Sequence, residues 1–216
     1  MSDVTVEDDL RHRLGRPRDQ GPRPTCLVFA VSDTHAAVRG AWEPLSCEYL
    51  YYHATRRDGA GPEDGTTLSA VLAAVEQDGQ PIEEMWPYLA KSPADTASWL
   101  PPDGVEEVFR CPGEVIGSSF DDAWSLVADG RPAVIAMTLS DAFYQPREGI
   151  VQSDEAVGTA RRHAVVAVAT GNRRPSRFLL VRNSWGRAWG TDGHAWLAEA
   201  YLTPRIIRVL ALKEVA

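Results

Sequence analysis

The chain has 216 residues, 44% of them hydrophobic and 24% charged, enough for one hydrophobic core or for two small lobes that share an interface. Its 22 Lys and Arg against 30 Asp and Glu give a formal charge of −8, so no basic surface is expected to bind nucleic acid. The first 25 residues are too polar for a signal peptide, and no later run has the length of a membrane span. We therefore expect a cytoplasmic protein without membrane contact.

The first half of the chain has the pattern of helices. A helix buried on most sides is predicted at residues 26–38, with Thr25 as a candidate N-cap. A second helix is predicted at about 45–57. A third, at 67–79, places its aliphatic side chains on one face and ends at a glycine. Before them, the acidic cluster at residues 7–9 is interpreted as a solvated terminus.

Strand patterns dominate after the proline-rich stretch at 92–104, apart from one short helix at about 120–129. Runs of strand length rich in Val, Ile and Leu occupy residues 132–140, 163–170, 177–185, 194–200 and 205–212. This order predicts an α+β fold, in which a helical lobe precedes an antiparallel sheet lobe and a cleft forms at their junction.

The chain has three cysteines, Cys26, Cys47 and Cys111, an odd number without CxxC spacing. This argues against a disulfide framework and a zinc site, and we expect no metal or other cofactor. Cys26 stands at the start of the first predicted helix, where unpaired amides and the helix dipole stabilise a thiolate. The alternative interpretation, a small buried core residue, describes most unpaired cysteines and applies to the other two.

Two later residues complete a catalytic pattern. His163 begins a predicted strand and offers an imidazole, whose pKa suits a general base near neutral pH. Asn183 supplies an amide oxygen that can accept the other ring N–H and orient the imidazole. Singly, each residue is more often structural. Together they follow Cys26 by 137 and 157 residues, which is close to the order and separation typical of papain-like enzymes.

The sequence resembles the papain family of cysteine peptidases over nearly its whole length. The most specific part is the stretch RHAVVAV…FLLVRNSWGRAWGTDGHAWL, and residues 45–53, 64–79 and 84–88 are similar to further family segments. The resemblance implies a single papain-like domain over residues 1–216. Its helical lobe would cover residues 20–105, and its β-barrel-like lobe residues 106–216, with residues 1–19 packing on the latter.

The resemblance implies roles for four catalytic residues. Cys26 would be the nucleophile, His163 the base and Asn183 the residue that orients the base. Gln20 stands six residues before Cys26, the interval at which its side-chain amide and the Cys26 backbone N–H form the family's oxyanion hole.

The resemblance also implies three substrate-binding residues. Trp185 would line the site and shield the His–Asn hydrogen bond from water. Gly65 would lend backbone hydrogen bonds to an extended peptide, and Ala136 would line the specificity pocket.

The sequence also departs from the family pattern. Arg23 stands where relatives have a cysteine, so the neighbouring disulfide is missing, in agreement with a cytoplasmic address. Gln20 follows closely on Met1, which predicts a form without a propeptide, and the preference for Arg over Lys indicates a bacterial origin. Arg161 and Arg162 precede His163 and are expected to lower its pKa.

We therefore predict a papain-like cysteine endopeptidase that hydrolyses a peptide or protein substrate through a thioester acyl-enzyme. One alternative is an acyl-transfer enzyme, such as a peptide ligase, cyclase or amidase, because the same triad supports both outcomes. The other is a non-catalytic module that binds extended peptides. The oligomeric state and the cleavage specificity are left open by the sequence.

Overall fold

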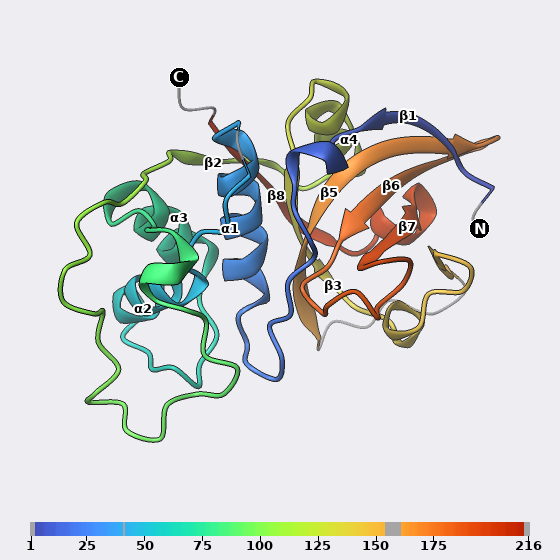
Figure 1. The fold of residues 1–216 in the computed structure, drawn as a ribbon. Helices are drawn as coiled ribbons and strands as arrows, with labels where there is room; N and C mark the ends of the chain where they lie inside the picture. The colour runs from blue at the N-terminus through green and yellow to red at the C-terminus, as the bar shows by residue number, and fades with distance from the viewer. Residues whose placement is uncertain (1–2, 41, 154–160, 214–216) are drawn as a thin grey trace. The chain divides into compact units, whose positions relative to one another are not determined.

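A computed structural model of the chain describes residues 3–40, 42–153 and 161–213, and the chain divides into two compact units (Figure 1). The sheet unit comprises Met1–Asp19 and Val115–Ala211, and the helical unit comprises Gln20–Glu114 and Leu212–Ala216. Within the described ranges, no helix has the length and apolar character needed to cross a bilayer.

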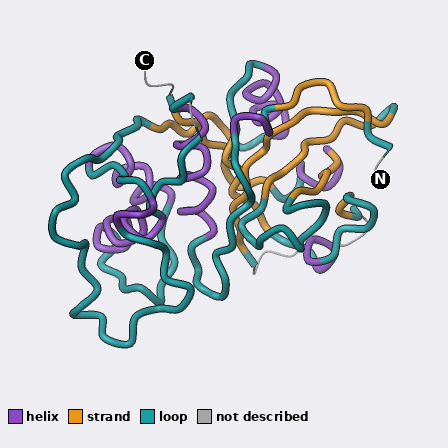
Figure 2. The backbone as a smooth tube through the Cα atoms, viewed as in Figure 1, coloured by secondary structure: helices purple, strands orange, loops and turns teal. Residues whose placement is uncertain are grey.

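Three α-helices form the helical unit: α1 (Cys26–Val38), α2 (Cys47–Arg57) and α3 (Leu68–Gln77). Every residue of α1 after the first is buried, which agrees with its run of apolar and small side chains. A short 3-10 helix, η2 (Glu83–Met85), follows. A long loop, teal in Figure 2, then leads to the sheet.

Side-chain caps begin α2 and α3 slightly later than the sequence predicts. The Ser46 hydroxyl accepts the Tyr49 N–H, and the Thr67 hydroxyl accepts the Ala70 N–H. Both residues have extended backbone angles, as N-caps do. The predicted starts at 45 and 67 therefore include residues that lie just outside the helices.

The sheet unit is built on one sheet in which the described strands follow the order β2-β8-β3-β5-β6-β7-β4, while β1 pairs with β5. The strands are β1 (Thr5–Asp9), β2 (Gly113–Gly117), β3 (Ala133–Thr138), β4 (Ile150–Val151), β5 (Arg162–Arg173), β6 (Ser176–Arg182), β7 (His194–Ala198) and β8 (Ile206–Leu212). The β5–β6 and β6–β7 pairs are antiparallel, and the short β4–β7 pair is parallel. Helices α4 (Phe120–Ala128) and α5 (Glu199–Leu202) and the 3-10 helices η1 (Arg11–Arg13) and η3 (Asp141–Tyr144) complete the unit.

Strand β5 runs through the middle of this unit, between β3 and β6 (Figure 1). It is buried without interruption from His163 to Gly171. Because neighbouring elements cover both of its faces, its sequence is continuously apolar rather than alternating. Helix α4 packs against β5 and β3, and the core includes Ile135, Val165 and Leu179.

The interpretation of residues 7–9 as a solvated terminus holds only in part, because Glu7 is exposed but Asp8 and Asp9 are half-buried, and all three belong to β1. Thr5 pairs with Asn172 and Asp9 with Ala169. The Asp8 N–H donates to the Thr170 hydroxyl (3.1 Å), which in turn donates to the Asp8 carboxylate (2.6 Å). Polar groups on β5 thus provide partners for acidic side chains that periodicity alone assigns to solvent.

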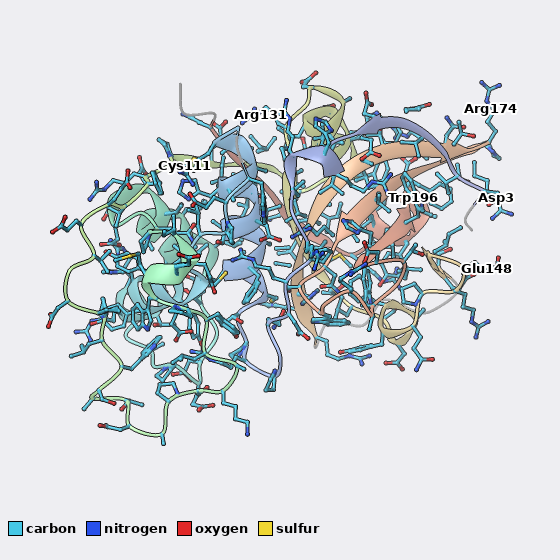
Figure 3. All side chains as sticks on the ribbon, in the orientation of Figure 1. Asp3, Cys111, Arg131, Glu148, Arg174 and Trp196 are labelled. Atoms are coloured by element: carbon cyan, nitrogen blue, oxygen red, sulfur yellow. The ribbon has the colours of Figure 1, made fainter. Side chains whose placement is uncertain are left out.

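Several predicted strands are also too long, such as the run at 177–185, which ends as a strand at Arg182. The run at 194–200 ends as a strand at Ala198, and α5 begins at Glu199. Trp196, labelled in Figure 3, lies in the part that remains strand.

Candidate active site

Cys26 differs from the other two cysteines in exposure. It is the first residue of α1 and is half-buried, whereas Cys47 and Cys111 are buried. Burial raises the pKa of the Cys111 thiol (labelled in Figure 3) to about 11, so at neutral pH it is almost entirely protonated. Cys26 is therefore the cysteine best placed to react with a molecule from solvent.

Thr25 takes the N-cap position of α1 but does not cap it with its side chain, so that part of the prediction is wrong. Its hydroxyl lies 2.8 Å from the Tyr88 hydroxyl. Tyr88 donates its single hydroxyl proton to the Gln20 carbonyl at 2.8 Å. The Thr25 hydroxyl must therefore donate to Tyr88.

Gln20 is buried and lies in a tight loop before Cys26. Its side-chain Nε2 donates to the Arg23 carbonyl at 2.7 Å. Gly21 has a φ of +60°, a left-handed conformation that glycine adopts without strain. The amide of Gln20 is thus held by its own loop, within the same unit as Cys26.

The candidate base lies in the sheet unit. His163 is the second residue of β5 and pairs with Met137 of β3. Its buried ring packs against the rings of Trp185 and Phe143, with centroid distances of 4.8 and 5.7 Å. Its Nε2 lies 2.7 Å from Oδ1 of Asn183, the residue that follows β6.

A backbone N–H determines which atom is the donor and which is the acceptor in the hydrogen bond between His163 and Asn183. The N–H of Ser184 donates to Oδ1 of Asn183 at 2.8 Å. A backbone N–H can only donate, so the oxygen of the Asn183 amide must face it. His163 then donates through Nε2–H to the same oxygen. In the neutral ring, Nδ1 is left as the proton acceptor, which is the state that a general base requires.

The electrostatic setting of His163 also favours the neutral ring. Burial lowers its pKa from 6.5 to about 4, and the hydrogen bond to Asn183 opposes this only in part. The expectation that arginines lower this pKa names the wrong cause. Arg161 forms an ion pair with Asp141 and lies over the Tyr144 ring, 5.3 Å from its centroid.

Trp185 links the aromatic cluster to the following turn. Its ring is half-buried, contacts His163, and stacks on Tyr144 with a centroid distance of 5.1 Å. The next residue, Gly186, has a φ of +69° and donates its N–H to the Arg18 carbonyl at 3.0 Å. A side chain at Gly193 (φ +77°) would lie 2.5 Å from Pro17, so the glycines of this motif are required by its backbone.

The other two predicted substrate-binding residues are placed as follows. Gly65 is an exposed loop residue of the helical unit, and open space surrounds the position of a Cβ there. Ala136 is the half-buried residue of β3 and lies opposite Ala164. Their contacts with substrate stay predictions.

The structure thus forms two groups of candidate residues. The first group, in the helical unit, contains Gln20 and Cys26, and the second, in the sheet unit, contains His163, Asn183 and Trp185. Within the part of the chain that the structure describes, no cluster of three or more His, Cys, Asp or Glu could hold a metal.

Three contributors were missed by the sequence analysis. The Ser184 N–H and the Phe143 ring help to hold the imidazole group. Ser184 has no signal beyond its place in NSWG, and Phe143, 40 residues before that motif, has none. Glu48, fully buried in α2, binds Arg23 in the loop before Cys26. An acidic residue within the apolar helix CEYLYY was the available signal for it.

The chain belongs to the papain family of cysteine proteases, because the family profile described as "Papain family cysteine protease" matches residues 27–204. That range begins one residue after Cys26.

Among curated proteins, it is 27% identical to a cathepsin L-like proteinase of Fasciola hepatica over 192 residues, which cover 84% of this chain and 56% of that protein. It spans about half the length of the curated relatives that it matches.

Solved structures bear out the papain-like α+β fold. Xylellain, a cysteine protease from Xylella fastidiosa, matches with a TM-score of 0.78 and 20% identity, covering 99% of this chain and 87% of that one. The bromelain protease from Ananas comosus, solved in complex with the E64 inhibitor, matches with a TM-score of 0.74 and 20% identity, covering 96% and 98%.

Proposed function

We propose that the chain is a cysteine endopeptidase that hydrolyses peptide bonds in peptide or protein substrates. The observation that carries this proposal is the bond from His163 Nε2–H to Asn183 Oδ1, at 2.7 Å. It keeps Nδ1 as a proton acceptor in a chain of the papain family whose accessible cysteine begins a buried helix.

In the first half of the proposed reaction, Cys26 Sγ attacks the carbonyl carbon of the scissile peptide while its proton passes to His163 Nδ1. The carbonyl oxygen becomes an oxyanion, which accepts hydrogen bonds from the Gln20 side-chain amide and the Cys26 N–H. The C–N bond then breaks as the imidazolium protonates the leaving amine. The product of this half is a thioester between Cys26 and the acyl part of the substrate.

In the second half, water attacks the thioester and gives its proton to His163 Nδ1. The new oxyanion collapses, the carboxylic acid leaves, and the thiolate is restored beside an imidazolium. Asn183 has the same task in both halves, because its oxygen stabilises the imidazolium and holds the ring in one orientation. A thiolate near the ring would raise the pKa of His163 above the value set by burial.

The proposal is tested by intact mass after brief treatment with one equivalent of an epoxysuccinyl peptide at about pH 6. An ordinary thiol of pKa about 8.5 hardly reacts at this pH. We expect a single adduct on the wild type and on the control Cys111→Ala. Cys26→Ala and His163→Ala should give none.

Peptide products then separate hydrolysis from acyl transfer. Hydrolysis adds one water to the mass of the two fragments together, whereas transfer to an amine gives a joined or cyclic product without that water. No adduct on the wild type, together with iodoacetamide labelling of Cys26 at higher pH, would contradict the peptidase and favour the peptide-binding module.

A further inference from the structure

Arg23, which lies three residues before Cys26, forms a buried ion pair with Glu48. Nη1 of Arg23 lies 2.6 Å from Oε2 of Glu48, and Nη2 lies 3.0 Å from Oε1, so the pair is bidentate. The exposed fractions of the two side chains are 2% and 0%. Both residues belong to the helical unit, Arg23 in the loop that carries Gln20 and Glu48 in α2.

Both partners of the pair make further hydrogen bonds. Glu48 also accepts the Leu89 N–H at 3.1 Å and Trp99 Nε1–H at 2.7 Å. Arg23 also donates to the Leu89 carbonyl at 2.8 Å, and its guanidinium lies over the Tyr51 and Tyr88 rings. Burial opposes the charge on Arg23, but the carboxylate outweighs it, so the pKa of Arg23 is raised. Arg23 therefore stays charged at neutral pH.

The backbone of Arg23 connects this pair to the candidate oxyanion hole. Its carbonyl accepts both Nε2–H of Gln20 at 2.7 Å and the N–H of Thr25 at 2.8 Å. The same loop contains Pro22 and Pro24, which have no backbone N–H to donate. A loop so poor in donors depends on side chains to fix it, and Arg23 is the side chain that reaches into the core.

Stability alone is a weak explanation for the pair. Two charges taken out of water are often no better for stability than two apolar side chains of the same volume. The bidentate geometry of the pair instead holds the Arg23 backbone in one place. The Arg23 carbonyl, which accepts the Gln20 amide, is held with it.

We propose that Arg23 and Glu48 are positioning residues that hold the Gln20 amide where it can donate to the oxyanion. This inference rests on the function proposed above. The link is ionic and lies where the family resemblance implies a disulfide, so the position of Gln20 does not depend on thiol oxidation.

The test uses the full chain with Arg23→Met and Glu48→Gln combined, because removing one charge alone would leave the other buried and unpaired. We expect kcat for peptide hydrolysis to fall by about 10- to 100-fold. A displaced oxyanion donor should lower kcat by no more than the complete loss of that donor does. KM should change by less than about threefold. Alkylation of Cys26 by iodoacetamide, which forms no oxyanion, should keep its rate within about twofold across pH.

A double-mutant cycle with Gln20→Ala makes the assignment specific. In that background, the paired replacement should have almost no further effect on kcat, because the group it positions is gone. The matched control is the ion pair of Arg57 and Asp78 in the same unit, which joins α2 to the end of α3 and is partly exposed. Arg57→Met with Asp78→Asn should leave kcat unchanged.

Each other outcome overturns the inference in a recognisable way. A wild type that hydrolyses no peptide removes the proposed function and this inference with it. An active wild type whose kcat is unaffected by the paired replacement removes only the positioning role. Equal losses in hydrolysis and alkylation, or losses that add to those of Gln20→Ala, would mean that the pair supports the fold and not the Gln20 amide.

Discussion

The two units hold their candidate catalytic groups by different means. In the sheet unit, His163 belongs to a paired strand, and neutral hydrogen bonds and aromatic rings fix its side chain. In the helical unit, the loop before Cys26 is held by a buried ion pair and by the Tyr88 hydroxyl. A strand receives its position from the backbone ladder, whereas a loop with two prolines needs side chains from elsewhere in the fold.

The comparison predicts different losses of activity when a candidate catalytic side chain is removed from each unit. The largest expected effect is that of His163→Ala, because Nδ1 has no substitute as proton acceptor in the proposed reaction. We expect kcat/KM for a fluorogenic peptide to fall by about 10⁴-fold. The control is His12→Ala, a surface position in η1, which should have no effect. A loss below tenfold would show that another group takes the proton.

The next effect in size belongs to the helical unit. Gln20→Ala should lower kcat by about 10²- to 10³-fold, the usual cost of losing one oxyanion donor. The stability of the protein should change little, because the Arg23 carbonyl keeps the Thr25 N–H as a donor and the Tyr88 hydroxyl bonds to the Gln20 backbone. Steady-state kinetics and urea unfolding on the same samples test both statements. A large loss of stability would mean that Gln20 holds the loop instead of being held by it.

Acid pH should lower the stability of both units. Each unit contains a buried histidine, so the loss of stability can be compared between them. Burial lowers the pKa of His35 in α1 and of His194 in β7 to about 4, as it does for His163. Between pH 6.5 and 4 the unfolded chain binds protons that the folded protein excludes, so stability is fully present above pH 6.5 and falls as the pH falls. Each histidine should remove about 2 kcal/mol between pH 7.5 and 5.

Urea unfolding at these two pH values measures this loss. His35→Gln and His194→Gln should each make the loss smaller by about 2 kcal/mol, whereas His12→Gln at the surface should leave it unchanged. If only His35→Gln reduced the loss, burial in the sheet unit would not lower the pKa of His194. A wild type equally stable at both pH values would contradict the buried neutral state of these histidines.

The two units also differ in how much of them the sequence reveals. Local pattern was sufficient for α1 and β5, because their long apolar runs determine their burial. The stretch NSWGRAWGTDG was equally informative, since the positive φ angles at Gly186 and Gly193 leave little choice of residue. These features depend on neighbours in the chain, so a local pattern is enough to indicate them.

What the sequence did not reveal depends on distant partners. Thr25 does not cap α1 with its side chain, and its hydroxyl donates to Tyr88, 63 residues away. Arg23 was noticed only as a departure from the family pattern, since its partner Glu48 lies 25 residues on, in a different element. Strand β1 was missed because the partners of its acidic side chains lie on β5. The periodicity of a sequence segment does not indicate contacts with residues that are distant in the chain.

The smallest expected effect concerns how the sheet unit orients its base. Asn183→Ala should lower kcat by about tenfold, because the ring loses its acceptor while β5 and the aromatic rings still hold it. Asn183→Asp separates orientation from charge. A carboxylate can still accept from the ring and from the Ser184 N–H, but it favours the imidazolium and so raises the pKa of His163.

The pH dependence of kcat/KM distinguishes these two contributions. Raising the pKa of the base moves the acid limb of the profile to higher pH, so Asn183→Asp should lose activity at pH 5 and recover most of it near pH 8. Asn183→Ala should lose activity at every pH, since its defect is one of orientation. If both variants moved the acid limb alike, the Asn183 oxygen would act through the charge on the ring, and the aromatic packing around His163 would be sufficient to orient it.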